Sequence, residues 1–248
     1  MCGLFGGFGP GVNPHILRSL AILNEKRGSD ATGFFNAVPG HRRTAQFLKW
    51  ANKSTNVLQD PDWRRWIETS CEASWAVCGH TRAGTRGGNK TENAHPFHYG
   101  EVIGAHNGNI DDPPKQYSVD SEWAFDLLSK ADPGAYQEAL GKLSGWYVLT
   151  WIDNRNGCVY LLNWTGNLSI QKVGRCVYYS SDSDHLKTAT GYKETMDLKH
   201  GQVMRFHNTA KGVHYARLED FTGTPRVVVV VHRNNHYNGH YDNSASDE

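Results

Sequence analysis

A cysteine stands at the second position of this chain, directly before Gly3. If Met1 is removed, Cys2 carries both a thiol and a free α-amine. An α-amine has a pKa of about 8, so part of it can accept a proton at neutral pH. A thiol attacks an amide only when an adjacent base or a lowered pKa activates it, and an N-terminal cysteine supplies its own base. A lone cysteine is more often a small buried hydrophobic residue, so neighbouring motifs decide between the two interpretations.

Three further segments combine glycine with residue types suited to catalytic loops. The first is 27–33 (RGSDATG), and the second is 79–87 (GHTRAGTRG), which is followed by 91–96 (TENAHP). The third is 106–108 (HNG), directly after a predicted strand. Taken singly, each has a simple structural explanation, because Gly, Asn and Asp mark turns and arginine is common on surfaces.

The bulk composition argues against several classes of partner. The chain has 248 residues, is 38% hydrophobic and carries a formal net charge of +1. Because Lys+Arg and Asp+Glu nearly cancel, no basic field favours nucleic acid or an anionic membrane. No apolar run approaches the length of a transmembrane helix, and the N-terminus lacks the basic region and cleavage site of a signal peptide.

The cysteines are odd in number and form no CxxC pair, so neither a disulfide framework nor a zinc site is favoured. They are Cys2, Cys71, Cys78, Cys158 and Cys176. We therefore expect a reducing, cytoplasmic compartment in which a reactive Cys2 stays a thiol. The sequence has no Walker loop and no Rossmann fingerprint, and we expect neither a cofactor nor a metal.

The elements that must position these segments are mixed in type up to Gly145. Strands are expected over 4–8, 74–79 and 101–105. A first helix is expected from the Asn13-Pro14 cap through Leu23, and a helical stripe at Trp123, Leu127 and Leu128. A further helix is expected to begin at Asp132-Pro133 and to carry on one face Tyr136, Ala139, Leu140 and Leu143.

After Gly145 the apolar pattern changes to the period of a strand. Residues 146–152 and 158–163 flank the sequence DNRNG, which predicts a hairpin. Further strands are predicted over 176–181, 202–206 and 227–231. Because there is no regular βαβ alternation, no repeat and no clear linker, the pattern favours an α+β fold.

The last stretch, 232–248, is rich in Asn, His, Asp and Ser. His232, His236 and His240 are four apart, a spacing that would align metal ligands on a helix face. The Asn and Gly content disfavours a helix, so we expect a polar, mobile tail.

Together with the start MCGLFG, the order and spacing of the motifs resemble the glutamine-hydrolysing domain of class II glutamine amidotransferases, a family of N-terminal-nucleophile hydrolases. The sequence is similar above all to the amidotransferase half of glucosamine-6-phosphate synthase. The resemblance covers residues 2–206 and includes 120–122 (DSE), 143–145 (LSG) and 180–182 (SSD). It implies a single domain over 2–231, with the fold of a four-layer α-β-β-α sandwich of two mainly antiparallel sheets.

The resemblance also implies a role for each matching residue. Cys2 is the nucleophile, and its α-amine is the general base through a water. The Asn107 side-chain amide and the Gly108 backbone N–H correspond to the oxyanion hole, which stabilises the tetrahedral intermediate. Arg82 pairs with the α-carboxylate of L-glutamine, for which a forked guanidinium is suited. Asp120 pairs with the α-ammonium.

Three more residues belong to the predicted surroundings of the site. Thr85 is expected to line the same loop as Arg82, and Arg27 and Asp30 are expected to form a structural pair near the nucleophile. Because this mechanism needs no histidine base, the neighbouring histidines are expected to make structural hydrogen bonds. They are His80, His95, His98 and His106.

The chain departs from the synthase in the loop that follows Arg82. Ala83-Gly84 stands where an aromatic residue is expected, and Arg86 stands where a histidine is expected. In the family this loop closes over glutamine and communicates with the acceptor site. The departures therefore bear on the acceptor more than on glutamine cleavage.

The residues beyond 207 are too few for an isomerase, synthetase or phosphoribosyltransferase domain. We expect a stand-alone subunit that supplies ammonia to a separate acceptor enzyme. Two alternatives stay open: a catalytically silent or partner-gated binding module, and an N-terminal-cysteine amidase for another amide. A retained Met1 would favour the first alternative. Trp63, Trp66 and 227–231 are expected in the core rather than on a docking face.

Overall fold

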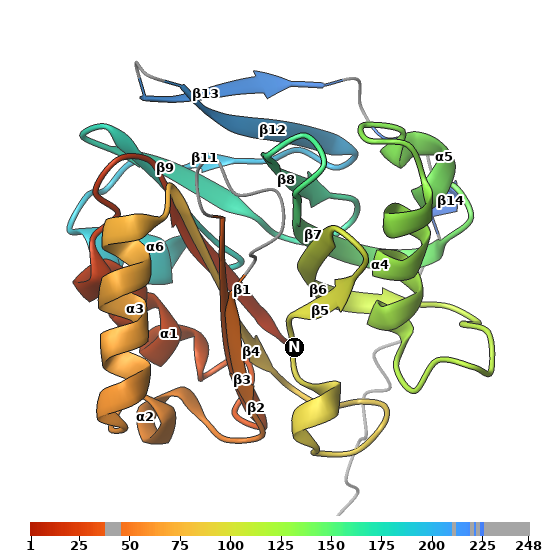
Figure 1. Cartoon of the computed structure of the whole chain (residues 1–248), viewed down its shortest axis with the longest axis horizontal. Helices are drawn as coiled ribbons and strands as arrows, with labels where there is room; N and C mark the ends of the chain where they lie inside the picture. Colours follow the sequence, from red (N-terminus) through yellow and green to blue (C-terminus); the bar gives the residue numbers. More distant parts are fainter. Residues whose placement is uncertain (38–45, 210–211, 219–220, 222–223, 226–248) are drawn as a thin grey trace, which may run out of the picture.

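Two β-sheets lie face to face in the computed structural model, which describes residues 1–37, 46–209, 212–218, 221 and 224–225 (Figure 1). The first sheet has the order β11-β9-β10-β1-β4-β2-β3. Its strands are β1 (Gly3–Phe8), β2 (Ala31–Ala37), β3 (Phe47–Trp50), β4 (Ala76–Arg82), β9 (Ser169–Val173), β10 (Cys176–Ser180) and β11 (Met196–Asp197). All its pairings are antiparallel.

The second sheet has the order β13-β12-β8-β7-β6-β5, and β14 pairs with β7 in parallel. Its strands are β5 (Phe97–Tyr99), β6 (Val102–Ile110), β7 (Ser144–Asp153), β8 (Cys158–Asn163), β12 (Gln202–Thr209), β13 (Gly212–Arg217) and β14 (Thr224–Pro225). The helices are α1 (Pro14–Asn24), α2 (Ser54–Val57), α3 (Pro61–Ala73), α4 (Asp120–Lys130), α5 (Tyr136–Leu140) and α6 (Ser183–Thr190).

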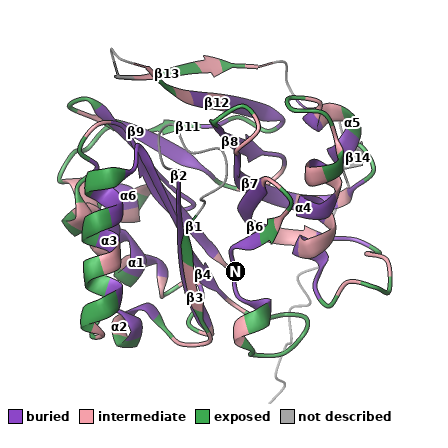
Figure 2. Ribbon diagram, in the orientation of Figure 1, coloured by how far each residue is buried: buried purple, intermediate pink, exposed green. Residues whose placement is uncertain are grey.

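Alternating side chains bury both faces of the central strands. In β1, Leu4 and Phe8 pack between the sheets against residues of the second sheet such as Val148. Phe5 points to the opposite face, where it packs with Leu17 of α1. Such two-sided burial explains why β1 reads as a continuous apolar and glycine run rather than as an alternating strand. Figure 2 shows most strand residues buried, whereas helix α3 exposes its outer side.

Helices cover the outer face of each sheet. Helices α1, α2, α3 and α6 pack on the first sheet around Phe34 and Tyr178. Helices α4 and α5 pack on the second sheet around Tyr147 and Trp151. The predicted mixed α+β fold with mainly antiparallel sheets is confirmed. Trp63 lies in the core, as expected, and Trp66 is partly buried against it. No described helix is long and apolar enough to span a membrane.

The capped helix and the hairpin agree with their predictions. The Asn13 side chain accepts a hydrogen bond from the His15 amide, and Pro14 opens α1. Strands β7 and β8 pair with the register Asp153↔Cys158 at the turn.

Several predicted boundaries are wrong. The predicted strand 74–79 is displaced: β4 begins at Ala76 and continues through Arg82. The helix expected from Asp132-Pro133 begins only at Tyr136, because Gly134 has φ +91° and Ala135 closes a turn onto Asp132. The sequence patterns did not predict strands β2, β3, β5, β9, β11, β13 and β14 or helices α2, α3 and α6. The predicted strand 227–231 and tail 232–248 lie outside the described residues.

The largest correction concerns the HNG motif. The predicted strand 101–105 corresponds to the first half of β6, which begins at Val102 and continues to Ile110. Asn107 and Gly108 therefore lie inside the strand and not in a loop after it. Strand β6 pairs with β7 along its whole length, from Val102↔Asp153 to Ile110↔Gly145. The polar residues in the second half of β6 face a cavity rather than the core. The alternation of apolar residues that indicates a strand therefore ends before the strand itself does.

Candidate active site

A cavity of about 340 Å3 lies beside the N-terminus. Strand β1 is central in its sheet and lies beside β4 (Figure 1). Its first residue, Gly3, pairs with Thr81 of β4, so Cys2 lies next to Arg82. The cavity is lined by Met1, Cys2, Arg82, Ala83, Thr85, Arg86, Asn93, His95, His106, Asn107, Gly108, Asn109, Val119, Asp120, Ser121 and Trp146. Segments from both sheets and from α4 therefore meet at one place.

The Cys2 thiol is held by the backbone of Ala83, the residue that follows β4. The Ala83 amide donates a hydrogen bond to Cys2 Sγ at 3.3 Å, and Sγ lies 3.6 Å from the Ala83 carbonyl oxygen. Burial raises the pKa of the Cys2 thiol, although the Ala83 hydrogen bond and the nearby N-terminal and Arg82 charges act in the opposite direction. A thiol in this state needs a base before it can attack. Met1 is present and 71% exposed.

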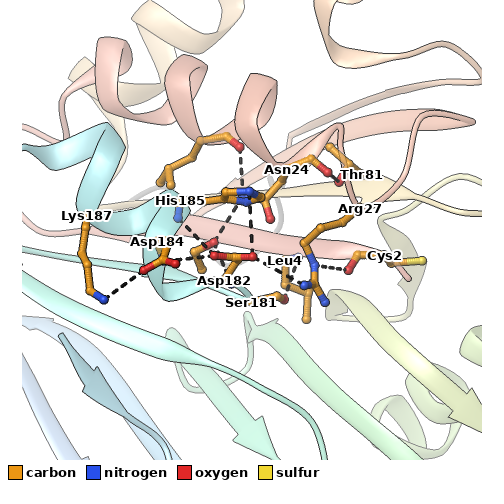
Figure 3. Close-up of polar contacts among 12 residues, drawn as sticks. Cys2, Leu4, Asn24, Arg27, Thr81, Ser181, Asp182, Asp184, His185 and Lys187 are labelled. Atoms are coloured by element: carbon orange, nitrogen blue, oxygen red, sulfur yellow. Dashed lines mark hydrogen bonds and ion pairs between the residues drawn. The ribbon is translucent and has the colours of Figure 1, made fainter.

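Arg27 and Asp30 hold two different walls of the cavity. Arg27 Nε donates to the Cys2 carbonyl oxygen at 3.0 Å, and Arg27 Nη1 lies 3.8 Å from Asp182 Oδ2 (Figure 3). Asp30 Oδ2 accepts from the Gly84 amide at 2.7 Å. The expected pair between Arg27 and Asp30 is not formed in the described part of the chain. Each instead fixes backbone on one side of the nucleophile.

Arg82 is 4% exposed, and its guanidinium fastens the loop 83–88. Its Nη1 donates to the Gly88 carbonyl at 2.9 Å, and its Nη2 donates to the Arg86 carbonyl at 2.5 Å. The Asn93 side chain donates to the Gly87 carbonyl of the same loop. A guanidinium has five N–H donors, so these two bonds leave others for a carboxylate in the cavity. Thr85 is exposed on this loop.

Asn107 and Gly108 are neighbours on β6 and both line the cavity. Gly108 has φ +139°, and a Cβ there would lie 2.2 Å from the Trp146 carbonyl oxygen, so only glycine fits. Asn107 Nδ2 lies 3.5 Å from Ser181 Oγ, a long contact. Asn107 Oδ1 is buried without a partner among the described residues. The side-chain amide is thus only weakly engaged within the protein.

Asp120, the first residue of α4, points its carboxylate at the end of β6. Its Oδ2 accepts from the Ile110 amide at 2.9 Å, and its Oδ1 accepts from the Ser121 amide at 3.0 Å. The two bonds fix the carboxylate plane at the cavity wall. The cavity therefore has an anion from α4 and a cation, Arg82, from β4.

Three predicted histidines make structural hydrogen bonds, as expected. His80 Nε2 donates to the His106 carbonyl at 3.0 Å. His95 Nε2 and His106 Nδ1 both contact Ser121 Oγ, at 3.0 and 2.9 Å. Burial lowers the pKa of His80 to about 3, and it also lowers the pKa values of His95 and His106. These rings are neutral at pH 7. His98 instead lies at the surface against the Phe47 ring.

The buried histidines predict a steep loss of stability in acid. Because the folded-state pKa lies below the unfolded value of 6.5, the unfolded chain takes up protons first as pH falls. Each histidine then lowers the free energy of unfolding by up to about 1.4 kcal/mol per pH unit below pH ~6. We expect urea midpoints to fall from pH 7 towards pH 4.5. Replacing His80 by Leu should reduce the pH dependence of the free energy of unfolding by the equivalent of about one proton. A flat profile would contradict the prediction.

Sequence reasoning missed three contributors to the site. Lys49 Nζ donates to the carbonyls of Glu92, Ala94 and Pro96 and so holds the segment that carries Asn93 and His95. Nothing in the local pattern of β3 indicates this contact. Ser121 and Asn93 stand inside quoted motifs, so their position was visible but not their function.

Among the described residues, no group of three His, Cys, Asp or Glu side chains could hold a metal ion.

Two solved structures are similar to this chain over most of its length. One is a glutamine phosphoribosylpyrophosphate amidotransferase from B. subtilis in complex with ADP and GMP, with a TM-score of 0.66, 18% identity and coverage of 90% of this chain. The other is the allosteric regulatory enzyme of purine biosynthesis, with a TM-score of 0.66, 20% identity and coverage of 87%. The chain has the fold of these enzymes. The resemblance predicted from the motifs is therefore confirmed at the level of the fold.

The chain spans about half of the length of both structures, which it covers to 51% and 49%. No family model and no curated protein sequence matches it.

Proposed function

We propose that this chain is a class II glutamine amidotransferase that hydrolyses L-glutamine to glutamate and ammonia through a thioester on Cys2. The observation that carries the proposal is the single cavity in which Cys2, Arg82, Asn107, Gly108 and Asp120 come together. It combines a nucleophile and two candidate oxyanion donors with a cation, Arg82, and an anion, Asp120, for the two α-groups of a free amino acid.

The proposed reaction begins after Met1 is removed. The α-amine of Cys2 takes the thiol proton through a water, and the thiolate attacks the amide carbon of the glutamine side chain. Asn107 Nδ2 and the Gly108 amide stabilise the oxyanion of the tetrahedral intermediate. The C–N bond breaks, the protonated amine returns its proton to the leaving ammonia, and water then hydrolyses the thioester to glutamate and free thiol.

The finer structural assignments belong to the same proposal. We infer an N-terminal-nucleophile hydrolase of the four-layer α-β-β-α type that forms one domain over 2–231. The helices on the outer face of each sheet support this assignment. The reducing environment that a free N-terminal thiol needs favours the cytoplasm.

We further propose that the ammonia passes to a separate acceptor enzyme. In support, one structural neighbour is named as an amidotransferase that uses phosphoribosylpyrophosphate, and its chain is about twice as long as the part matched here. The loop 83–88, which carries Ala83, Gly84 and Arg86 in place of the synthase residues, lies at the cavity and is exposed from Gly84 onward. This loop is where acceptor coupling would differ.

The experiment that tests the proposed function measures glutamate release and intact mass on the same sample. Protein without Met1 should release glutamate from L-glutamine. It should act poorly on 4-aminobutanamide, which lacks the α-carboxylate, and on glutaramic acid, which lacks the α-amine. Loss of Met1 without any glutamate release, but with alkylation of Cys2, would favour an amidase for another amide. A retained Met1 and no activity would favour the silent binding module.

Substitution of Arg82 separates substrate binding from the fastening of the loop. We expect Arg82→Ala to raise KM for L-glutamine by about 10- to 100-fold, because a charged hydrogen-bond pair is lost. The same variant should barely change the slow hydrolysis of 4-aminobutanamide, which has no carboxylate to lose. An equal loss on both substrates would mean that Arg82 acts only through its bonds to the Arg86 and Gly88 carbonyls.

A further inference from the structure

One hydroxyl joins two segments of the cavity wall. Ser121 Oγ lies 3.0 Å from His95 Nε2 and 2.9 Å from His106 Nδ1. Ser121 is 3% exposed and belongs to α4, whereas His95 follows the short turn at Thr91–Asn93 and His106 belongs to β6. The contact therefore crosses between elements that are distant in the sequence.

The protons of this junction have few possible arrangements. A serine hydroxyl has one proton, so at most one of the two ring nitrogens can accept from it, and the other must donate. His80 Nε2 donates to the His106 carbonyl, because a carbonyl oxygen can only accept. The second ring nitrogens of His80, His95 and His106 are buried without a partner among the described residues. Among the described residues, Ser121 is therefore the one hydrogen-bond partner of the His95 and His106 rings, which also pack against the rings of His80, Phe97 and Tyr147.

Helix α4 holds β6 at two points that flank the oxyanion donors. Ser121 contacts His106, and the neighbouring Asp120 accepts from the Ile110 amide at 2.9 Å. Asn107 and Gly108 lie between these two points on the strand. The helix that presents the candidate ammonium-binding carboxylate thus also holds the stretch of β6 that presents the donors.

The junction extends to the loop held by Arg82. His95 lies in the segment whose carbonyls are bound by Lys49 Nζ at 3.0 and 3.3 Å. In the same segment, Asn93 donates to the Gly87 carbonyl of the loop 83–88. Ser121 is therefore the point at which α4, β6 and this segment meet.

We propose that Ser121 is a positioning residue for the amide hydrolysis, whose hydroxyl sets the spacing between the Asp120 carboxylate and the donors of Asn107 and Gly108. A substrate bound through its α-ammonium then presents its side-chain amide to those donors. This inference rests on the proposed function. The hydroxyl acts through His106 and Asp120 rather than on a reacting atom.

The test compares Ser121→Ala with Ser121→Thr, which retains the hydroxyl, and with Ser129→Ala. Ser129 lies on the same helix and donates to the Asp126 carbonyl, away from the cavity, so it is a matched control. Since a displacement of about 1 Å costs about 100-fold in rate, we expect Ser121→Ala to lower kcat/KM by about 10- to 100-fold. Ser121→Thr should recover most of this loss, and Ser129→Ala should resemble the wild type.

The rate of Cys2 alkylation by iodoacetamide distinguishes a loss of positioning from a general disturbance of the site around the nucleophile. This reaction needs the nucleophile but neither the oxyanion donors nor the α-group contacts, so its rate should be unchanged in Ser121→Ala. The imidazole 15N signals of His95 and His106 should shift together, and those of the exposed His98 should not. A kcat/KM within about twofold of the wild type, or an alkylation rate that falls as much as turnover, would overturn the inference.

Two further experiments distinguish a failure of the positioning role from a failure of the proposed function. His95→Leu removes one arm of the junction without changing Ser121 and should also lower kcat/KM. L-glutamine binding is compared between Cys2→Ala and Cys2→Ala/Ser121→Ala by calorimetry. A wild type that binds but does not hydrolyse glutamine would overturn the proposed function, and weaker binding in the double variant would still support the positioning role. Equal binding in the two variants, with equal 15N spectra, would overturn that role.

Discussion

Replacement of Cys2 by alanine is expected to abolish glutamate release, with a loss of at least about 10,000-fold in kcat. The expectation follows from the position of Sγ at the cavity, where the Ala83 amide is its hydrogen-bond donor and where Cys2 is the one cysteine among the described lining residues. Because burial raises the pKa of this thiol, the thiolate is formed during the reaction by a base rather than present beforehand. The measurement is glutamate formed per enzyme over hours.

Cys158→Ala is the matched control for the loss of a thiol. Cys158 is buried at the start of β8, outside the cavity, and its substitution should leave turnover unchanged. A Cys2→Ala protein that retained one-tenth of wild-type turnover would show that another group is the nucleophile. L-glutamine should still bind to Cys2→Ala, since Arg82 and Asp120 are intact in that variant.

Replacement of Asn107 by alanine is expected to lower kcat by about 100- to 1,000-fold with little change in KM. The side-chain amide is nearly free of protein partners, since its Nδ2 contact to Ser181 Oγ is 3.5 Å long. Its donor is therefore available for an oxyanion that develops only in the transition state. The measurement is steady-state glutamate release over a range of glutamine concentrations.

Two comparisons sharpen this prediction. Asn107→Asp keeps the shape but removes the donor and adds a negative charge, so it should be at least as damaging as alanine. Asn208→Ala, at an exposed position of β12, should have no effect. If Asn107→Ala raised KM and left kcat unchanged, Asn107 would bind the ground state of the substrate and the oxyanion assignment would be wrong.

Both predictions depend on a site whose parts are fixed mainly by backbone contacts. Cys2 is held through its carbonyl by Arg27 and through its thiol by the Ala83 amide, and the Asp120 carboxylate is held by two backbone amides. Groups fixed in this way keep their geometry without reorganisation when charge develops, which is the condition for electrostatic stabilisation.

The sequence by itself determined the candidate chemistry. A cysteine at position 2 can provide a thiol and an amine from one residue, and this is a property of covalent structure that needs no fold. Local signals also determined the Asn13-Pro14 helix start and the DNRNG hairpin, because capping and turn chemistry act within a few residues. The mixture of strands and helices without regular βαβ alternation was enough for the α+β class.

The tertiary structure alone decided how the site is assembled. Strand β6 continues through Asn107 and Gly108 because β7 pairs with it, and a pairing partner some 40 residues away leaves no mark on the local pattern. Arg27 and Asp30 bind different backbone groups instead of each other, since each lies beside a strand end that only the sheet order brings there. The contact of Ser121 with His95 and His106 likewise joins three separate segments. Residue types can indicate the chemistry of a site. The distances between its side chains arise from long-range strand pairing and packing, which no short stretch of sequence encodes.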